Sequence, residues 1–304
     1  MRFILKRLGI YTLSLFGVLF VVFIFLYKVP GDPVITMLGF NATQEDKENL
    51  RKALGLDRPV TVQYVIFCRR LFTLDLGRSV IGDFDIGKEL KERLPRTFLL
   101  AFLAFLMALF PGIFLGVGGA LNKKMDVFVR TIVIFAGSFP VFYLAFLSLW
   151  LFGYKLGWIS VSGSTEASSV FLPAFILSIS PMAVIARITN VSLRKTMREY
   201  HYLFLYSMGI SKRILIWKYG LREILVSIIS TGGNIFIFLF GGTFFVESIF
   251  GYPGIGLLGV DAMLNFDYPV IQDVVALTAM AFLVVNFLTD ILYAWSDPRV
   301  RRYG

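Results

Sequence analysis

The chain has 304 residues, of which 57% are hydrophobic and only 16% are charged, and its formal net charge is +10. About a quarter of the residues in soluble domains are charged, so this composition excludes an ordinary water-soluble protein and indicates that lipid surrounds much of the chain. The single cysteine (Cys68) and the single histidine (His201) exclude an internal disulfide framework and a histidine-rich metal site.

Six apolar segments are long enough, or nearly long enough, to cross a membrane, which requires about 20 residues. We expect each to be a helix, because an open sheet edge cannot be satisfied in lipid. The first follows three basic residues, as a signal peptide would, but its apolar stretch is too long and it lacks a small-residue cleavage site, so an uncleaved helix is predicted. The six ranges are 9–27, 97–122, 131–154, 167–186, 224–246 and 274–296.

The basic residues are distributed by membrane side, which argues against nucleic-acid binding as the reason for the net charge. The amino end has three Lys or Arg residues, the turn at 123–130 has three, the stretch at 187–223 has eight and the carboxyl tail has three. By contrast, the connection at 155–166 has only Lys155, and that at 247–273 has four acids and no base. With six spans, this pattern predicts both termini in the cytoplasm.

Three regions follow from this topology: a first transmembrane helix with a cytoplasmic start at 1–28, an extracytoplasmic loop region at 29–95, and a five-helix transmembrane core at 96–304. Within the loop region, Thr43 is expected to cap a helix that ends at Gly55. The mixed aromatic and basic stretch at 63–72 predicts a helix that lies at the membrane interface. The connection at 247–273 contains a Gly- and Pro-rich turn and predicts a partly buried or re-entrant segment.

The cytoplasmic stretch at about 187–223 is far longer than a turn and mixes basic residues with apolar and aromatic ones. Gly209 is expected to separate two short helices, with Ser211 placed to cap the second. Apolar side chains at this position would need either a groove on a partner protein or a bed of anionic headgroups. The residues alone favour neither.

Short motifs spread along nearly the whole chain give it a resemblance to the permease subunits of ABC importers. In order and spacing they are similar to those of the dipeptide, oligopeptide and nickel class, whose members are binding-protein-dependent transport system inner membrane components. The motifs are Pro30-Gly-Asp-Pro33, Leu54-Gly-Leu-Asp-Arg-Pro59, Asp75-Leu-Gly-Arg-Ser79, Glu92-Arg-Leu-Pro95, Leu156-Gly-Trp158, Ser162-Gly163, Gly209-Ile-Ser-Lys-Arg213, Pro253-Gly-Ile-Gly256, Asp267-Tyr-Pro-Val270 and Asp297-Pro-Arg299.

This resemblance implies an all-α membrane protein with six transmembrane helices and the type I permease fold of ABC importers. It implies a translocation path for peptides or similar small solutes, with nickel or another small solute as the alternative. The implied partners are a second permease subunit, homologous or identical, two cytoplasmic ATP-binding subunits, and an extracytoplasmic solute-binding protein. The chain itself would then be no enzyme and hold no cofactor or metal, since ATP is bound by the partners, and it would lie in a bacterial or archaeal inner membrane.

The resemblance also places the ATPase-coupling loop in the cytoplasmic stretch. This chain departs from the family there, because Tyr200 and His201 stand where an acid and a tyrosine are usual, so a bulkier helix face is expected. The basic residues Arg213, Lys218 and Arg222 could contact either a partner or lipid phosphates. The residues predicted to form the coupling loop are Tyr202, Leu205, Tyr206, Gly209, Ser211 and Arg213.

Few polar groups lie inside the predicted spans. Asp290 and Asn286 share a helix face four residues apart, and we expect them to make structural hydrogen bonds in the bundle interior. The apolar spans offer no paired carboxylates and no nucleophile–base set, which argues against a membrane enzyme and a proton-coupled carrier. An autonomous secondary transporter or channel remains the alternative of a different class. The small residues Gly112, Gly116, Gly118 and Gly119 predict close helix packing.

Overall fold

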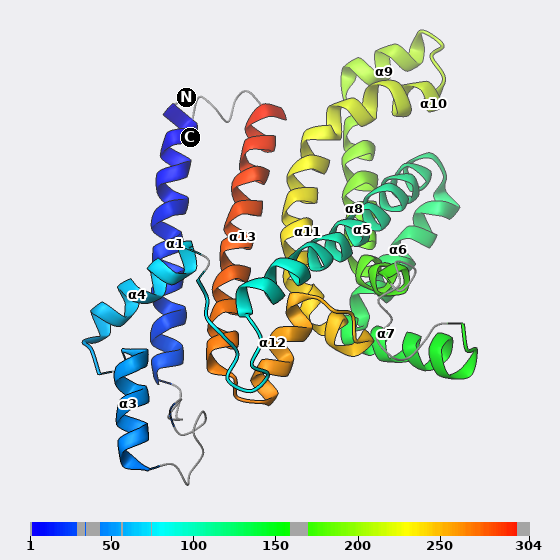
Figure 1. Cartoon of the computed structure of the whole chain (residues 1–304). Coiled ribbons are helices and arrows are strands. Elements are labelled where there is room, and N and C mark those ends of the chain that lie inside the picture. Colours follow the sequence, from blue (N-terminus) through cyan, green and yellow to red (C-terminus); the bar gives the residue numbers. More distant parts are fainter. Residues whose placement is uncertain are drawn as a thin grey trace. The chain divides into compact units, whose positions relative to one another are not determined.

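The computed structural model describes residues 2–28, 34, 43–55, 57–73, 75–158 and 170–296, and the regular elements among them are helices (Figure 1). The motifs predicted at 30–33, 162–163 and 297–299 lie outside the described residues. The chain forms two compact units, which are described separately. One contains residues 1–96 with 253–284, and the other contains residues 97–252 with 285–304.

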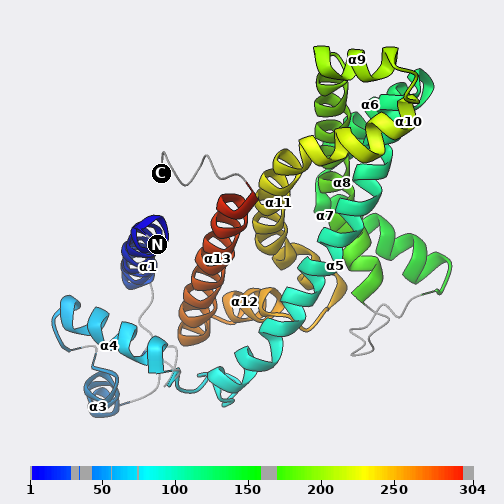
Figure 2. The same ribbon diagram turned by 90° about the horizontal axis from the view of Figure 1, so that it is seen from above.

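In the first unit, α4 lies across α1 (Figures 1 and 2). The rings of Phe20 and Tyr64 meet edge to face with centroids 5.4 Å apart, and the Tyr64 hydroxyl donates a 2.7 Å hydrogen bond to the Phe16 carbonyl. These contacts fix α4 against α1. The helices with most or all of their residues in this unit are α1 (Arg2–Lys28), α3 (Gln44–Leu54), α4 (Val60–Thr73), α12 (Ile255–Leu264) and α13 (Tyr268–Ser296).

The predicted ends of α3 are confirmed. The Thr43 hydroxyl accepts a hydrogen bond of 3.2 Å from the Asp46 N–H, which satisfies one of the free donors of the first turn. Gly55 ends the helix with φ +68°, a left-handed conformation that glycine adopts without strain.

The second unit is built around α8 and α11, which pack together, with α5 and α6 against α8. Its apolar core combines Leu100 of α5, Leu177 of α8 and Leu239 of α11, all less than 5% exposed. The elements mainly in this unit are α5 (Ile86–Leu121), α6 (Lys123–Ser138), α7 (Val141–Ser148), the π-helical segment η1 (Leu149–Lys155), α8 (Phe171–Thr196), α9 (Tyr200–Ser207), α10 (Lys212–Ile214), the π-helical segment η3 (Leu215–Gly220) and α11 (Leu221–Phe250).

The small residues of the second span pack as predicted. A Cβ at Gly116 would lie 2.5 Å from the Thr189 Cβ and 2.6 Å from the Ala186 carbonyl oxygen, so only glycine allows α5 to approach α8 this closely. Gly112 and Gly119 meet α8 in the same way, one turn to either side.

Five helices of the described chain are long and apolar enough to cross a membrane, or six if a bent pair counts as one span. The bent pair is a correction to the single third helix expected at 131–154. There, α6 and the α7–η1 helix meet at 92°, with Pro140 at the break. Proline cannot donate an N–H, and its ring clashes with the preceding turn, so the helix cannot continue through it. A second correction concerns Glu247, expected in a loop, which lies completely buried within α11.

Candidate functional site

An element at 200–220 joins α8 to α11. Beyond the end of α8, the chain turns into α9, then through Gly209 into α10, which continues as η3 into α11 (Figures 1 and 2). Gly209 has φ +87°, a conformation that side-chain-bearing residues rarely adopt. Ser211 is the N-cap of α10, and its hydroxyl accepts from the Ile214 N–H at 3.5 Å. The predicted glycine break and serine cap are therefore present.

Tyr202 anchors α9 to the helix bundle. Its side chain is 3% exposed, and burial, together with hydrogen bonding to the Glu223 carboxylate at the start of α11, raises its pKa. His201 lies between two carboxylates, with Nδ1 3.7 Å from Glu199 and Nε2 3.6 Å from Glu223. The contacts that Tyr202 and His201 make with Glu223 tie α9 to α11.

The following segment is anchored by apolar packing. Ile216 of η3 is fully buried in a cluster with Leu193 of α8 and Ile224 of α11. A displacement of the 200–220 element must therefore move the ends of α8 and α11, because a close-packed core does not deform freely.

The same short helix carries large apolar side chains that are open to solvent. Tyr200 is 93% exposed, and four more residues of α9 and its carboxyl end are each more than half exposed. Isolated apolar side chains are common on protein surfaces, but a contiguous group marks an interaction site. We call this group the coupling patch, and it consists of Tyr200, Leu203, Phe204, Tyr206 and Met208.

The residues predicted for the coupling loop fall on different sides of this element. Tyr206, Gly209, Ser211 and Arg213 are exposed, whereas Leu205 is half-buried and Tyr202 points into the bundle. Four members of the patch were not among the predicted site residues, namely Tyr200, Leu203, Phe204 and Met208. No local signal separates them from the buried residues, because α9 is apolar or aromatic nearly all round.

Comparison with known proteins gives the family. The sequence profile described as binding-protein-dependent transport system inner membrane component matches residues 112–302, and its N-terminal counterpart matches residues 1–101. The chain belongs to this family. The predicted resemblance is thus confirmed, and the chain is a multi-pass membrane protein and a permease component.

Curated relatives match this permease component along its full length. It is 35% identical over 308 residues to a protein of Brucella abortus (strain 2308) named as a peptide transport system permease, with 98% of each chain covered. It is 32% identical to the glutathione transport system permease protein of Pectobacterium atrosepticum, with 99% of each covered. A chain of the inward-facing MetNI methionine ABC transporter shares the fold, with a TM-score of 0.56 at 17% identity, covering 68% of this chain and 96% of that one.

Two motifs of the permease component meet in its first unit. The Ser79 hydroxyl donates a 2.5 Å hydrogen bond to the Asp267 carboxylate, and both residues are buried. Arg70 orders the same loop by donating to the carbonyls of Asp75 (3.2 Å) and Leu76 (2.6 Å). The contacts hold the loop after α4 against the start of α13.

The two polar residues predicted for the bundle interior lie near the end of α13. Asn286 and Asp290 are both half-buried, one helical turn apart. Their predicted structural role stays a prediction.

Proposed function

We propose that this chain is the permease subunit of an ATP-driven importer and that the coupling patch docks a cytoplasmic ATP-hydrolysing subunit. The observation that carries this proposal is the coupling patch, an exposed apolar surface on a short helix that Tyr202 anchors to Glu223 at the start of α11. A helix of this kind fits a hydrophobic groove on a partner protein. Binding of the coupling patch to lipid headgroups is the weaker alternative. Tyr200 and Phe204 belong to a helix that extends beyond the ends of α8 and α11, away from the helices that would lie in the membrane (Figure 1).

A recess beside α9 supports a protein partner. It has a volume of about 380 Å³ and is lined by Tyr202, Tyr206 and three basic residues, Arg194, Arg198 and Lys212. A side chain bearing a carboxylate could enter it and pair with Arg198 and Lys212. The proposed docking surface thus combines an apolar patch with a basic recess, as expected of a specific interface.

The proposed mechanism uses the anchored 200–220 element as a lever. ATP binding would draw two ATPase subunits together, and each would pull the element docked on it. Because Ile216 and Tyr202 are buried against α8 and α11, this movement would be passed to the bundle and change which side of the membrane has access to the path. A second permease subunit would complete the path, and a solute-binding protein would deliver solute on the outer side.

Peptides or similar small solutes are the proposed cargo. This rests on relatives that match the whole chain and are named for peptide and glutathione transport. The proposed location is the cytoplasmic membrane of a bacterium or archaeon, with both termini and the 200–220 element inside. ATP is proposed to bind only to the partner subunits.

Reconstitution tests this proposal. The chain is placed in proteoliposomes with its second permease and ATPase subunits, and uptake of a labelled dipeptide is measured with the solute-binding protein and with internal ATP. We expect uptake only when both ATP and the ATPase subunits are present. Uptake by the chain without an ATPase subunit would instead identify an autonomous transporter.

A further inference from the structure

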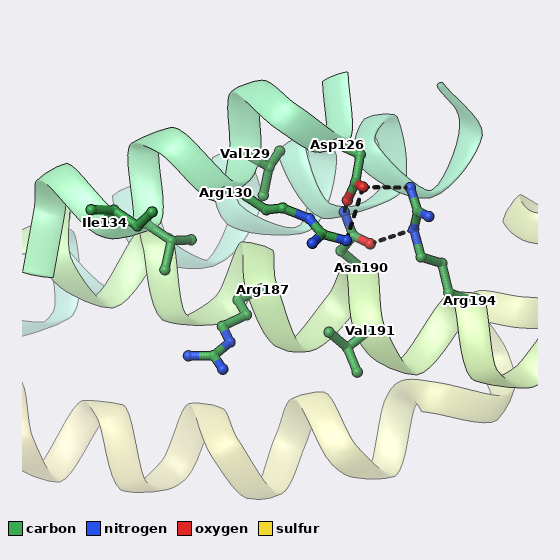
Figure 3. Close-up of a pocket in the computed structure, with 9 residues that line it drawn as sticks. Asp126, Val129, Arg130, Ile134, Arg187, Asn190, Val191 and Arg194 are labelled. Atoms are coloured by element: carbon green, nitrogen blue, oxygen red, sulfur yellow. Dashed lines mark hydrogen bonds and ion pairs between the residues drawn. The ribbon is translucent and has the colours of Figure 1, made fainter. Parts of the chain in front are cut away.

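A basic pocket lies between α6 and α8 in the second unit (Figure 3). Residues at helical spacing on each helix form its walls, so one face of α6 meets one face of α8 across it. Its volume is about 440 Å³, within the range of small-molecule sites. The lining residues are Asp126, Val129, Arg130, Val133 and Ile134 of α6, and Arg187, Asn190, Val191 and Arg194 of α8.

The charges of the pocket do not balance. Arg130 and Arg194 both lie 3.1 Å from the Asp126 carboxylate, so a single acid faces two guanidinium groups. The third arginine of the pocket, Arg187, is exposed and makes no hydrogen bond or ion pair with any residue in the described part of the chain. In Figure 3 its side chain stands apart from the bonded cluster of Asp126, Asn190 and Arg194. An excess of guanidinium groups favours an anion, and phosphate accepts paired N–H donors well.

The rim of the pocket is apolar. Ile134 and Val191 flank the arginines and are 68% and 60% exposed. Both belong to helices that cross the membrane or begin a broken span, so these exposed side chains face acyl chains more naturally than water. Basic groups beside an apolar rim match the two halves of a phospholipid.

The position of the pocket along α6 and α8 also suits a phospholipid. Lys123 and Lys124 begin α6, and Lys195 stands near the end of α8, so basic residues collect at this end of both helices. This is the end proposed to face the cytosol. Arg187 lies two turns deeper than Arg194, about 10 Å along the helix, and its long side chain can reach towards the headgroup level.

We propose that this pocket binds the phosphate of an anionic phospholipid of the cytosolic leaflet, with Arg187 as the main phosphate ligand and Ile134 and Val191 against the acyl chains. The inference rests on the proposed function only for the orientation of the chain. A lipid here would occupy the groove beside the Asp126–Arg194 pair, directly before the 200–220 element.

Native mass spectrometry of the purified full-length chain tests the site. The chain is released from micelles supplemented with dioleoyl phosphatidylglycerol or dioleoyl phosphatidylcholine, and bound lipids are counted. We expect selective retention of phosphatidylglycerol, reduced about fivefold by Arg187→Gln, the effect typical of one basic side chain at an anionic surface. Lys195→Gln removes the same charge from an exposed position of α8 outside the pocket, so it should lower retention of phosphatidylglycerol much less than Arg187→Gln.

A second variant, Ile134→Glu, keeps the proposal testable if Arg187→Gln fails to fold. Ile134→Glu adds a repelling carboxylate at a position that is 68% exposed, and it should lower retention of phosphatidylglycerol in the same way. Equal retention of the two lipids, or equal losses in Arg187→Gln and Lys195→Gln, would overturn the proposal. Displacement of phosphatidylglycerol by excess inorganic phosphate would show a free-phosphate site and also overturn it. The assay contains no ATP, partner or solute, so its failure is distinct from failure of the proposed function.

Discussion

Arg194 of α8 reaches Asp126 of α6 with its guanidinium 3.1 Å from the carboxylate, and the same group donates a 2.8 Å hydrogen bond to the Gly119 carbonyl at the end of α5. Asn190 completes the cluster, since it donates to Asp126 at 3.0 Å and accepts from Arg194 at 2.8 Å. One side chain therefore joins the ends of three helices next to the segment that leads to the coupling patch.

Arg194→Gln is expected to destabilise the second unit by about 1–3 kcal/mol, because the buried Asp126 carboxylate loses a charged donor. Arg130→Gln is the matched control. Arg130 makes an ion pair of the same length with Asp126, but its side chain is 71% exposed, so solvent screens the interaction. The free energy of unfolding in micelles measures both. Equal losses of unfolding free energy in the two variants would contradict the expectation that Arg194 stabilises the unit more than Arg130 does.

Gly116→Ala should separate α5 from α8, since the new methyl group would lie within 2.6 Å of both Thr189 and the Ala186 carbonyl. Overpacking of this kind typically costs about 1–3 kcal/mol. Gly241→Ala in α11 is the control, because nothing lies within 4 Å of its Cβ position. Thermal melting of the isolated chain should fall only for Gly116→Ala; an unchanged melting temperature in both would refute the close approach.

Ser79→Ala should loosen the loop at 75–85, because the buried Asp267 carboxylate loses its hydroxyl donor. The expected cost is about 1–3 kcal/mol. The adjacent Arg78→Gln removes an ion pair to Asp83 in which both side chains are more than 65% exposed, and it should have no measurable effect. Hydrogen exchange of the loop amides distinguishes the variants, and faster exchange in Arg78→Gln alone would oppose this assignment.

Tyr200→Ala and Tyr202→Ala form a matched pair on one short helix. Tyr200 is 93% exposed and Tyr202 is 3% exposed, so only the first can lie at a partner interface without unpacking α9. We expect Tyr200→Ala to keep the melting temperature and weaken binding of the ATPase subunit, and Tyr202→Ala to lower the melting temperature. Co-purification with the ATPase and melting curves measure the two effects. Unimpaired binding by Tyr200→Ala would remove this residue from the proposed interface.

Much of the fold could be predicted because membrane helices are long apolar runs. The spans that became α1, α5, α8, α11 and α13 were found from hydrophobicity alone, although the structure extends several of them. Features that depend on a single residue were also predicted, such as the helix cap at Thr43 and the helix break at Gly209. Pro140 predicts a kink in the third span but not its size, because a proline can bend a membrane helix slightly or break it, and tertiary packing decides between these.

The orientation of α9 could not be predicted for a different reason. Its sequence from Tyr200 to Ser207 is apolar or aromatic nearly all round, so it has no polar face to show which side is buried. Tyr202 faces inward because Glu223, 21 residues later, meets its hydroxyl. Contacts between distant motifs, such as Ser79 with Asp267, depend on the path of the chain between them and leave no local pattern.

The measurement that tests the central claim most directly is the number of solute molecules imported per ATP hydrolysed by the complete transporter carrying Gly209→Trp. The backbone at Gly209 has φ +87°, which costs other residues about 1–2 kcal/mol, while open space around it accommodates a side chain. The substitution should therefore leave the bundle inserted but redirect the coupling patch. We predict continued ATP hydrolysis with little uptake. Uptake and ATPase stimulation equal to those of the unaltered protein would contradict the account.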